Sequence, residues 1–533
     1  MKKRMINKGL LLGIGVSLLT MTSCEKYLTQ EPRNSTYNEA FWKNSTDVNS
    51  AVAANYALFR QAIFSGNNQP RHWMYGDAVA NAYFTIQYTG DGLEGIQTGD
   101  WTFDYNLNAM GNYSQFYKSI AMSNLILERL PEIKDADLGV TNPAVFRNRV
   151  EGQAYFLRAL TYFYMARVWG DVPIVTEVVD NPLGSPELPR DPMVDVLKQA
   201  ELDAQKALSK LEWTYTNNND RAVTANKGSA YALLAHLYLW RATMSDVSND
   251  NPIMEDVNSA DTSINAIMSR NYYTLTDTAN YYQTFVGKSN ESIFELNMSE
   301  TQLEGTTRHI GMYFLPAALL NGASQRNFVK PGFLSTHFYK LGTVWQWVWY
   351  ANPGEWRWEG VPTRQADYKD VRAMKGFMNH TNPQPRVIKY QNVNYRNPTN
   401  RTNAHMSNNL IIFRLADMEL LKAEIALYKN DVAAARTIVN KFRVRNGADV
   451  SSYVPETVTR SQMFSEYMIE RSKELFLEGH LFYDGLRTRQ YATYTPWLST
   501  SRFRQEGFHW PLAPIHFRNN IYLRQTKYWR GKI

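Results

Sequence analysis

The sequence predicts a mostly α-helical protein, in which tetratricopeptide-like helical hairpins form a scaffold and long irregular loops with short β-hairpins lie on one side. Three observations lead to this prediction. Proline-free stretches with apolar residues at helical spacing occur in both halves of the chain. One of them reads as a pair of helices close in length to a tetratricopeptide unit. Two long stretches rich in Gly, Asn and aromatic residues interrupt the helical pattern.

The helical pattern is clearest in three places. Residues 147–170 (RNRVEGQAYFLRALTYFYMARVWG) mix small and bulky residues without proline and stop at a glycine. Residues 226–244 alternate Ala and Leu with Tyr and Trp at helical spacing. Residues 410–447 predict two helices joined at residues 429–431, the second ending at Asn446-Gly447. Because the repetition is loose, we expect helical hairpins packed side by side and not a regular solenoid.

Two irregular regions, residues 66–111 and about 271–409, separate these helical segments. A strand-like run at residues 291–298 and a tryptophan-rich hairpin lie within the second. Loops of this length are uncommon in compact proteins and tend to carry function. We therefore divide the chain into residues 1–23, an N-terminal part at 24–270, and a C-terminal part at 271–533 that contains the irregular region, helical pairs at 410–480 and a tail.

The N-terminus has the features of a secretory signal. MKKRMINK contains four basic residues and no acid, GLLLGIGVSLLT is a short apolar core, and MTSC follows. Cys24 is the single cysteine of the 533 residues, so a disulfide within the chain is impossible. We expect lipid attachment at Cys24, because Met21-Thr22-Ser23-Cys24 resembles the bacterial lipobox, with Met where Leu is more usual. The alternative is a signal cut elsewhere and an incidental cysteine.

The charge balance argues against a nucleic-acid-binding protein. Loss of residues 1–23 removes four positive charges, so the formal net charge falls from +7 to +3. The Lys and Arg residues are dispersed, and no basic run with interleaved aromatics occurs. No second apolar segment approaches bilayer length, so we expect a soluble body held at a membrane by the lipid on Cys24.

Residues 345–360 (WQWVWYANPGEWRWEG) contain five of the 14 tryptophans: Trp345, Trp347, Trp349, Trp356 and Trp358. Tryptophans at every second position follow the side-chain period of a strand, and Asn-Pro-Gly-Glu predicts a turn. With Pro353 and Gly354 at the centre of the turn, Trp349 faces Trp358 and all five rings share one face of a hairpin. That face either packs inwards as cross-strand aromatic pairs or contacts a ligand, since an indole can lie flat on a sugar ring.

An enzyme is the main rival class. Glu470, Glu474 and Glu478 fall at i, i+4 and i+8, and paired carboxylates are what glycoside hydrolysis needs. Arg471 and Lys473 lie beside them, so we interpret the glutamates as ion-pairing partners of neighbouring helices and expect no catalytic residues. No HExxH pair occurs, a thiolate cluster is excluded, and Val286-Gly287-Lys288-Ser289 lacks the first glycine of a phosphate loop.

We expect no metal or other cofactor. Asp91, Glu94 and Asp100 in a glycine-rich loop could hold a calcium ion, but their spacing fits no defined calcium loop, and a solvated acidic loop is the preferred interpretation.

Seven segments along the whole chain form a recognisable series: CEKYLTQEP (24–32), FWKNSTDVNSAVAANYALF (41–59), VEGQAYFLRALTYFYMARVWGDVPIVTE (150–177), IIFRLADMELLKAEIA (411–426), AARTIVNKFRVRNGA (434–448), IERSKELFLEGHLFYDGLR (469–487) and HWPLAPIHFRNN (509–520). In this order they resemble the SusD/RagB family of nutrient-binding outer-membrane lipoproteins. Two departures are Gly485, inserted in the usual Asp-Leu pair, and Leu512-Ala513, which lengthens the Pro-x-Pro segment by one residue. The motifs belong mainly to the helical framework and do not identify the ligand.

The resemblance implies a mostly helical, cell-surface lipoprotein of the outer membrane that forms the lid of a SusC-type TonB-dependent transporter and captures oligosaccharides or, in some members, peptides. It also implies that the irregular side binds the ligand, and clustered tryptophans favour a glycan. A peptide-binding lid and a structural subunit without a soluble ligand remain as alternatives. We expect ligand contacts from the five hairpin tryptophans, Arg357, Tyr83, Trp101 and Asn106. For Trp101 the alternative is an anchor for a helix at residues 111–130.

Overall fold

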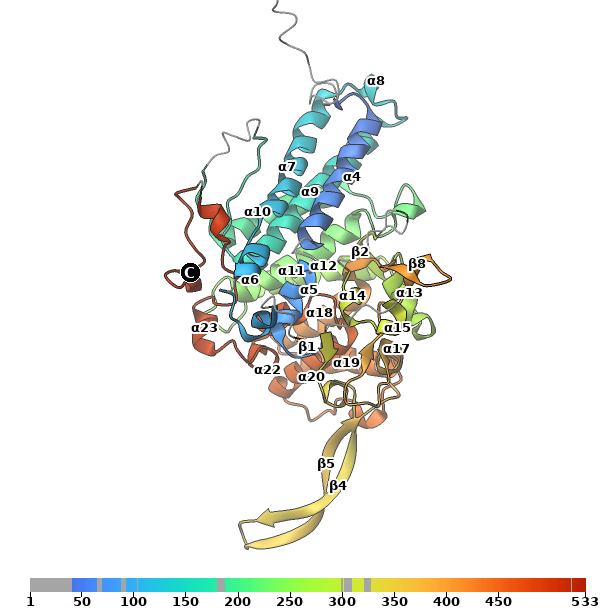
Figure 1. The fold of residues 1–533 in the computed structure, drawn as a ribbon, viewed down its shortest axis with the longest axis vertical. Coiled ribbons are helices and arrows are strands. Elements are labelled where there is room, and N and C mark those ends of the chain that lie inside the picture. Colours follow the sequence, from blue (N-terminus) through green and yellow to red (C-terminus); the bar gives the residue numbers. More distant parts are fainter. Residues whose placement is uncertain are drawn as a thin grey trace, which may run out of the picture.

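The computed structural model describes residues 41–64, 70–87, 93–102, 104–179, 187–298, 301, 309–320, 327–518 and 520–533. Most of these residues are helical, as the sequence predicts (Figure 1). The expected lipid site at Cys24 and the acidic residue Asp91 lie outside the described residues. None of the described helices combines the length and the apolar character needed to cross a membrane.

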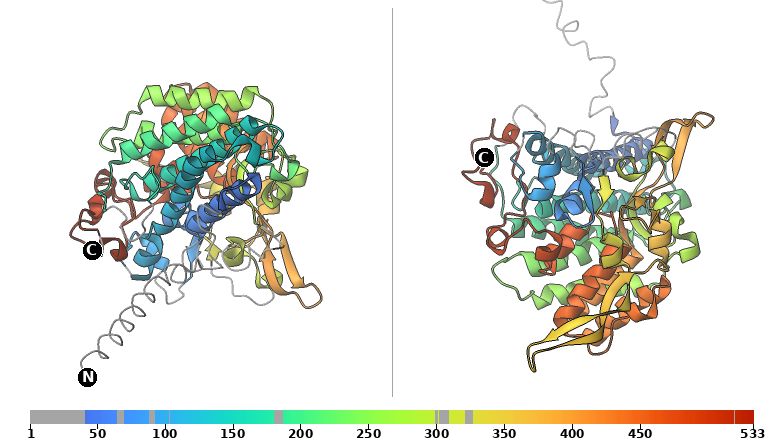
Figure 2. Two further views of the ribbon diagram at one scale, coloured as in Figure 1. Left: turned by 90° about the horizontal axis from the view of Figure 1, so that it is seen from above. Right: turned by 60° about the horizontal axis from the view of Figure 1, so that its bottom comes forward.

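Long helices form one side of the molecule. They are α4 (Ser45–Phe64), α7 (Ser114–Arg129), α9 (Pro143–Trp169), α10 (Met193–Lys210), α11 (Lys227–Met244) and α12 (Met254–Ser269). Consecutive members pack side by side from α9 to α12, and α4 and α7 cover the other flank of α9 (Figure 2). The C-terminal half adds α18 (Leu415–Tyr428), α19 (Val432–Arg445) and α20 (Arg460–Glu474), which contact one another and α12.

The helix boundaries follow local chemistry. The side chain of Asn142 accepts a hydrogen bond from the Val145 amide at the start of α9, with Pro143 as the first helical residue, and α9 ends before Gly170 at a φ of 72°. Asn226 and Ser229 form a capping box at α11, as Thr459 and Gln462 do at α20. The predicted helices at residues 147–170 and 226–244 are therefore confirmed.

Shorter elements form most of the other side. The short helices there are α5 (Arg71–Gly76), α6 (Asp104–Met110), α13 (Tyr281–Val286), α14 (Gly311–Phe314), α15 (Ala317–Leu320), α16 (Phe333–His337), α17 (Val371–Gly376), α21 (Leu481–Arg487), α22 (Tyr491–Tyr494) and α23 (Thr500–Arg504), whereas α8 (Asp135–Leu138) packs at the end of the long helices. The strands form antiparallel pairs: β1 (Phe84–Ile86) with β3 (Asn327–Val329), β2 (Ser292–Leu296) with β10 (Leu410–Arg414), β4 (Tyr339–Tyr350) with β5 (Glu355–Ala366), β6 (Phe377–Met378) with β7 (Arg386–Val387), and β8 (Val393–Asn397) with β9 (Thr402–Met406).

One predicted helix is shorter than expected. The prediction that residues 410–447 form two helices is wrong at its start, because Leu410–Arg414 is the strand β10 and α18 begins at Leu415. All five residues of β10 are buried, and their backbone pairs with β2, which is the strand predicted at residues 291–298. A short apolar run cannot be assigned to helix or strand by its periodicity alone.

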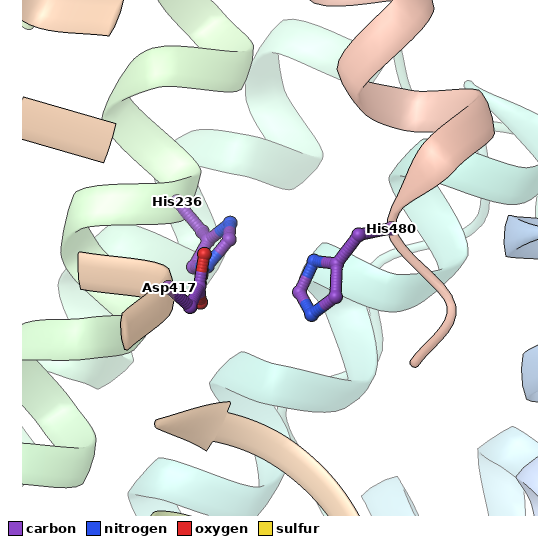
Figure 3. A group of neighbouring side chains, drawn as sticks. All are labelled: His236, Asp417 and His480. Carbon is purple, nitrogen blue, oxygen red and sulfur yellow. Dashed lines mark hydrogen bonds and ion pairs between the residues drawn. The ribbon is translucent and has the colours of Figure 1, made fainter. Parts of the chain in front are cut away.

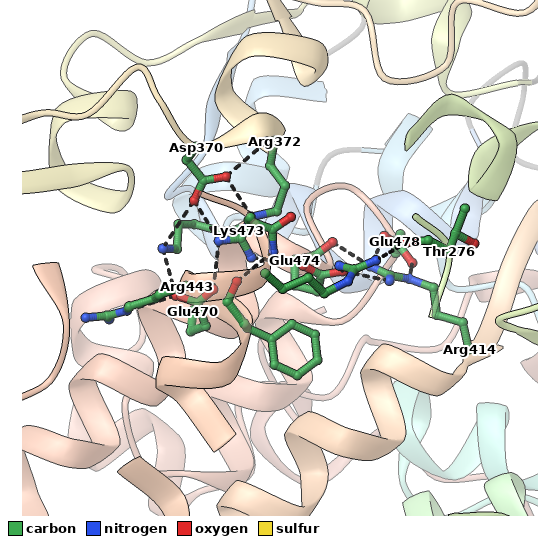
Figure 4. A network of polar contacts seen from close by, with 12 residues as sticks. Thr276, Asp370, Arg372, Arg414, Arg443, Glu470, Lys473, Glu474 and Glu478 are labelled. Atoms are coloured by element: carbon green, nitrogen blue, oxygen red, sulfur yellow. Dashed lines mark hydrogen bonds and ion pairs between the residues drawn. The ribbon is translucent and has the colours of Figure 1, made fainter. Parts of the chain in front are cut away.

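A buried network of ion pairs surrounds the end of α20 (Figure 4). Arg414 contacts Glu291 at 2.5 Å, Glu474 at 2.9 Å and Glu478 at 2.8 Å. Arg372 contacts Glu470 at 2.7 Å and Glu474 at 2.9 Å. The interpretation of the three glutamates as ion-pairing partners is confirmed. They do not share one helix, because α20 ends at Glu474 and Glu478 lies in the following turn.

The network changes the protonation equilibria of its members. Burial alone would raise the pKa of Glu470, but Arg372, Lys473 and Arg443 lower it to about 2. Burial likewise opposes ionisation of Arg414, whose pKa is nevertheless held well above its usual value by Glu478, Glu291 and Glu474. These groups are therefore ionised at neutral pH.

The turn after α20 is tied to the N-terminal half. The Gly479 amide donates a hydrogen bond of 2.7 Å to the Asp77 carboxylate, and a His72 ring nitrogen lies 2.9 Å from the Glu478 carbonyl oxygen. A Cβ on Gly76 would lie 2.1 Å from the Gly479 oxygen, so this close approach requires a glycine. Burial raises the pKa of Asp77 to about 8, against a smaller opposing effect of the Gly479 amide.

We predict that Arg414→Met destabilises the protein by about 3–5 kcal/mol, because three buried carboxylates lose a partner. Urea unfolding followed by circular dichroism measures the change. Arg436→Met is the matched control: Arg436 pairs with Glu456, which is 85% exposed, and the expected loss is below about 1 kcal/mol. Equal losses in the two variants would contradict a special role for the buried network.

We also predict that Asp77→Asn changes the pH dependence of stability. The folded-state pKa of about 8 lies above the ordinary value of 3.8, so the folded chain holds the proton more tightly. The contribution of Asp77 is therefore complete below pH 3.8 and is lost as the pH rises through 8. The variant should match the native protein in urea unfolding near pH 4 and exceed it near pH 8. If the difference in unfolding free energy between the variant and the native protein is the same at pH 4 and pH 8, the raised pKa of Asp77 is contradicted.

Candidate functional site

The predicted tryptophan hairpin is the pair β4–β5, which projects from the end of the molecule opposite the start of α4 (Figure 1). Trp349 pairs with Trp356, Trp347 with Trp358, and Trp345 with Gly360. This register corrects the predicted pairing of Trp349 with Trp358. The shift is two residues, which preserves the side-chain alternation, so all five tryptophans lie on one face as predicted.

The tryptophans are exposed and do not pack against the body of the protein. Their side chains are between 51% and 62% exposed. Among the described residues, their ring contacts are with each other: Trp347 and Trp358 meet at 5.6 Å and 61°, and Trp349 and Trp356 at 5.4 Å and 52°. Trp345 covers Gly360, where a Cβ would lie 3.4 Å from its ring. The alternative that this face packs inwards is therefore wrong.

The cross-strand pairs account for the stability of the projecting hairpin. An isolated two-stranded hairpin is marginal in water, and each edge-to-face aromatic pair adds about 0.5–1.5 kcal/mol beyond its area burial. The indoles thus hold the strands together and still present about half of their surface to solvent. From the row of Trp345 to the row of Trp349 this aromatic face is about 14 Å long at a rise of about 3.4 Å per residue.

The opposite face of the hairpin is polar. Arg357 pairs with Val348, so strand alternation places it away from the tryptophans. Its guanidinium contacts Glu355 at 2.5 Å and lies 4.9 Å from the centre of the Tyr350 ring. Arg357 therefore lies on the opposite face from the tryptophans, in an ion pair with Glu355, and its expected contact with a ligand stays a prediction.

The base of the hairpin is fixed to α20. Glu466 accepts a hydrogen bond of 2.7 Å from the Tyr339 hydroxyl and contacts Arg364 at 2.6 Å. Its third partner is Arg443, at 2.6 Å, which in turn pairs with Glu470. Sequence reasoning missed Glu466, although its position four residues before Glu470 places it in the same row of α20.

Two other predicted contacts lie in the core. Tyr83 is 1% exposed and its ring is 5.0 Å from that of Phe476. Trp101 is fully buried and stacks on Trp510 at 4.1 Å with an interplanar angle of 5°. Because both side chains are buried, the expectation that they contact a ligand is wrong. Trp101 is an anchor, as the alternative held, but its stacking partner Trp510 lies in the C-terminal segment. Asn106 lies in α6, and its side chain is not among those described.

One group of side chains resembles a metal site by composition. His236 from α11, Asp417 from α18 and His480 place ligand atoms within 4.8 Å of one another (Figure 3). The Asp417 carboxylate is already bonded to His236 and to Arg471, each at 2.7 Å. Burial lowers the pKa of His236, so its ring is neutral. With a guanidinium on the carboxylate, the group is a filled hydrogen-bonded part of the core.

Comparisons with known proteins agree with this architecture. A family model described as "Starch-binding associating with outer membrane" matches residues 26–239, and the SusD family model matches residues 213–513. SusD-like protein P38 of Formosa agariphila is 25% identical over 96% of this chain and 97% of its own length. SusD-like protein P25 of the same organism is 23% identical over 87% of both chains.

Solved structures show the same fold. A SusD homolog from Bacteroides thetaiotaomicron has a TM-score of 0.73 at 22% identity, covering 91% of this chain and 99% of its own. NanU of B. fragilis has a TM-score of 0.69 at 18% identity, covering 93% and 99%.

We predict that Trp347→Ala leaves the free energy of global unfolding unchanged within about 0.5 kcal/mol, because the ring does not contact the body. Hydrogen exchange of the β4–β5 amides should accelerate, since a cross-strand pair is lost. Trp101→Ala is the buried control and should cost about 3–5 kcal/mol. A large global loss in Trp347→Ala would show that the hairpin is part of the core.

The SusD family model covers more than half of the chain, and the helical scaffold, the irregular side and the order of the matched segments all agree with it, so this protein belongs to the SusD family.

Proposed function

We propose that the protein is a cell-surface, glycan-binding lipoprotein that captures oligosaccharides and passes them to a SusC-type TonB-dependent transporter, for which it forms the lid. Membership of the SusD family and the match described as "Starch-binding associating with outer membrane" support this assignment. The observation that carries it for this chain is the exposed face of five tryptophans on β4–β5. Binding takes place without turnover of the ligand.

The aromatic face favours a sugar over a charged ligand. Indole faces stack on the apolar C–H face of a pyranose ring, and the strip from Thr343 to Pro362 contains no ionised side chain on the tryptophan side. The hairpin projects away from the body of the protein (Figure 1), so a glycan chain can lie across it without inserting one of its ends into a pocket. We infer that this face contacts an internal stretch of a neutral glycan.

The position of the hairpin fits a tethered receptor. The chain enters α4 at one end of the molecule, and the tryptophans lie at the other (Figure 1). A lipid on Cys24 would hold the first end near the membrane and leave the aromatic face at the far end. The transporter partnership rests on the family, and co-purification of the two proteins from solubilised membranes would test it.

We predict that Trp345→Ala weakens binding of a neutral glycan at least tenfold. Trp345 covers Gly360 and has no ring partner within the described part of the chain, so its removal should leave the hairpin intact. Residues 25–533 are titrated calorimetrically with plant, host and microbial polysaccharides, their oligosaccharides and a peptide mixture. Val348→Ala, on the opposite face, is the matched control and should bind as the native protein does.

Three outcomes would overturn parts of this proposal. If peptides bind and no glycan does, the ligand is a peptide and not a glycan. If Trp345→Ala binds glycan as tightly as the native protein, the hairpin is not part of the binding site. Turnover of the glycan by the purified protein would contradict a binding role.

A further inference from the structure

A second candidate site lies on the helical scaffold, away from the hairpin. A groove of about 500 Å³ is bounded by α9, by the end of α10 and by the loop at residues 211–225. We call it the helical groove. Asn49 of α4 and Val145 of α9 lie on its rim, so it is near the end where α4 begins, opposite β4–β5 (Figure 1). Its volume lies in the range of small-molecule sites.

The floor of the helical groove contains an unsatisfied acceptor. Gln153 of α9 is 3% exposed, and its Oε1 is buried with no hydrogen-bond partner. A buried polar atom without a partner costs about 1–3 kcal/mol. An apolar residue of similar length at position 153 of α9 would avoid this cost. A donor supplied by a ligand would remove it.

Arg149, four residues before Gln153 on α9, supplies donors to the lining of the same groove. Its Nη2 donates to Asn49 at 2.8 Å, and its guanidinium lies 5.1 Å from the centre of the Phe146 ring. Burial lowers the pKa of Arg149, and among the described residues no carboxylate lies within ion-pair distance of it. A guanidinium has five N–H groups, and the bond to Asn49 uses one of them, so Arg149 has further donors to offer a ligand in the groove that it lines.

The formal charges of the residues that line the helical groove sum to zero. Arg149 and Lys210 are matched in number by Glu212 and Asp220. Lys210 is also paired with Glu151. A net-neutral lining that contains both donors and acceptors suits a ligand whose groups both donate and accept, which is the property of a hydroxyl. The half-buried ring of Tyr215 adds an apolar surface.

We propose that the helical groove is a binding site for a small neutral saccharide, whose neighbouring hydroxyls donate hydrogen bonds to Gln153 Oε1 and the Asp220 carboxylate and accept them from the Arg149 guanidinium. This site is separate from the aromatic face on β4–β5. It recognises a mono- or disaccharide by hydrogen bonding, whereas the hairpin contacts a longer chain by stacking. The two sites can therefore succeed or fail independently.

The test compares sugars that share a ring and differ in charge. Residues 25–533 are titrated by calorimetry and by saturation-transfer NMR with glucose, galactose, mannose, xylose and their common disaccharides, and with glucuronate, galacturonate and a dipeptide mixture. We expect at least one neutral sugar to bind, with the uronate of the same ring at least tenfold weaker.

The variants separate the two sites. Gln153→Met removes the acceptor at nearly constant side-chain length and should have a melting temperature no lower than that of the native protein. Both Gln153→Met and Arg149→Ala should lower the affinity for the sugar at least tenfold. Trp345→Ala, on the hairpin, and Arg436→Ala, on the outer face of α19, should leave this binding unchanged.

The proposal is overturned if no neutral sugar binds, if a uronate or a dipeptide binds and neutral sugars do not, or if Gln153→Met binds as tightly as the native protein. Loss of binding in Trp345→Ala would also overturn it, because the signal would then come from the hairpin. Failure of the hairpin to bind glycan, with the groove still active, would contradict only the proposed aromatic site.

Discussion

The arrangement of the C-terminal half depends on the buried charges around α20. Arg372, Arg414 and Arg443 each contact more than one carboxylate, and these carboxylates come from α20, the turn after it, the segment before β2 and the N-cap of α17. Desolvation of so many charges is costly, so only a geometry that satisfies them all is stable. The same helix holds the hairpin through Glu466. The internal electrostatics therefore fix the direction in which the exposed aromatic face points.

The long helices could be predicted because their determinants are local. Residues 147–170 and 226–244 have continuous helical periodicity, and their limits coincide with cap residues and a glycine that need no tertiary information. The side-chain alternation of the tryptophans was equally local, which is why their shared face was predicted correctly in spite of a register error. The pairing itself depends on the four residues between Tyr350 and Glu355, and Asn-Pro-Gly-Glu also fits a tighter turn.

What could not be predicted depends on contacts between distant segments. Leu410–Arg414 is a strand because β2 is beside it, and its sequence alone is also compatible with helix. Trp101 and Tyr83 occur in a glycine-rich loop like exposed aromatics, yet their partners Trp510 and Phe476 lie about four hundred residues away in the chain. The helical groove had no sequence signal, since Gln153 falls within a regular helical pattern and becomes notable only when its acceptor is found without a donor.

The self-supporting hairpin has a consequence for how proteins with this scaffold can diversify. Its rings pair with each other across the strands, and its attachment to the body is confined to the strand ends near Tyr339 and Arg364. The scaffold therefore tolerates a longer, shorter or differently decorated arm at this position without repacking. The exposed aromatic surface can therefore change by exchange of the hairpin, while the helical framework stays constant. The hairpin can thus be exchanged as a unit without a change in the helical framework.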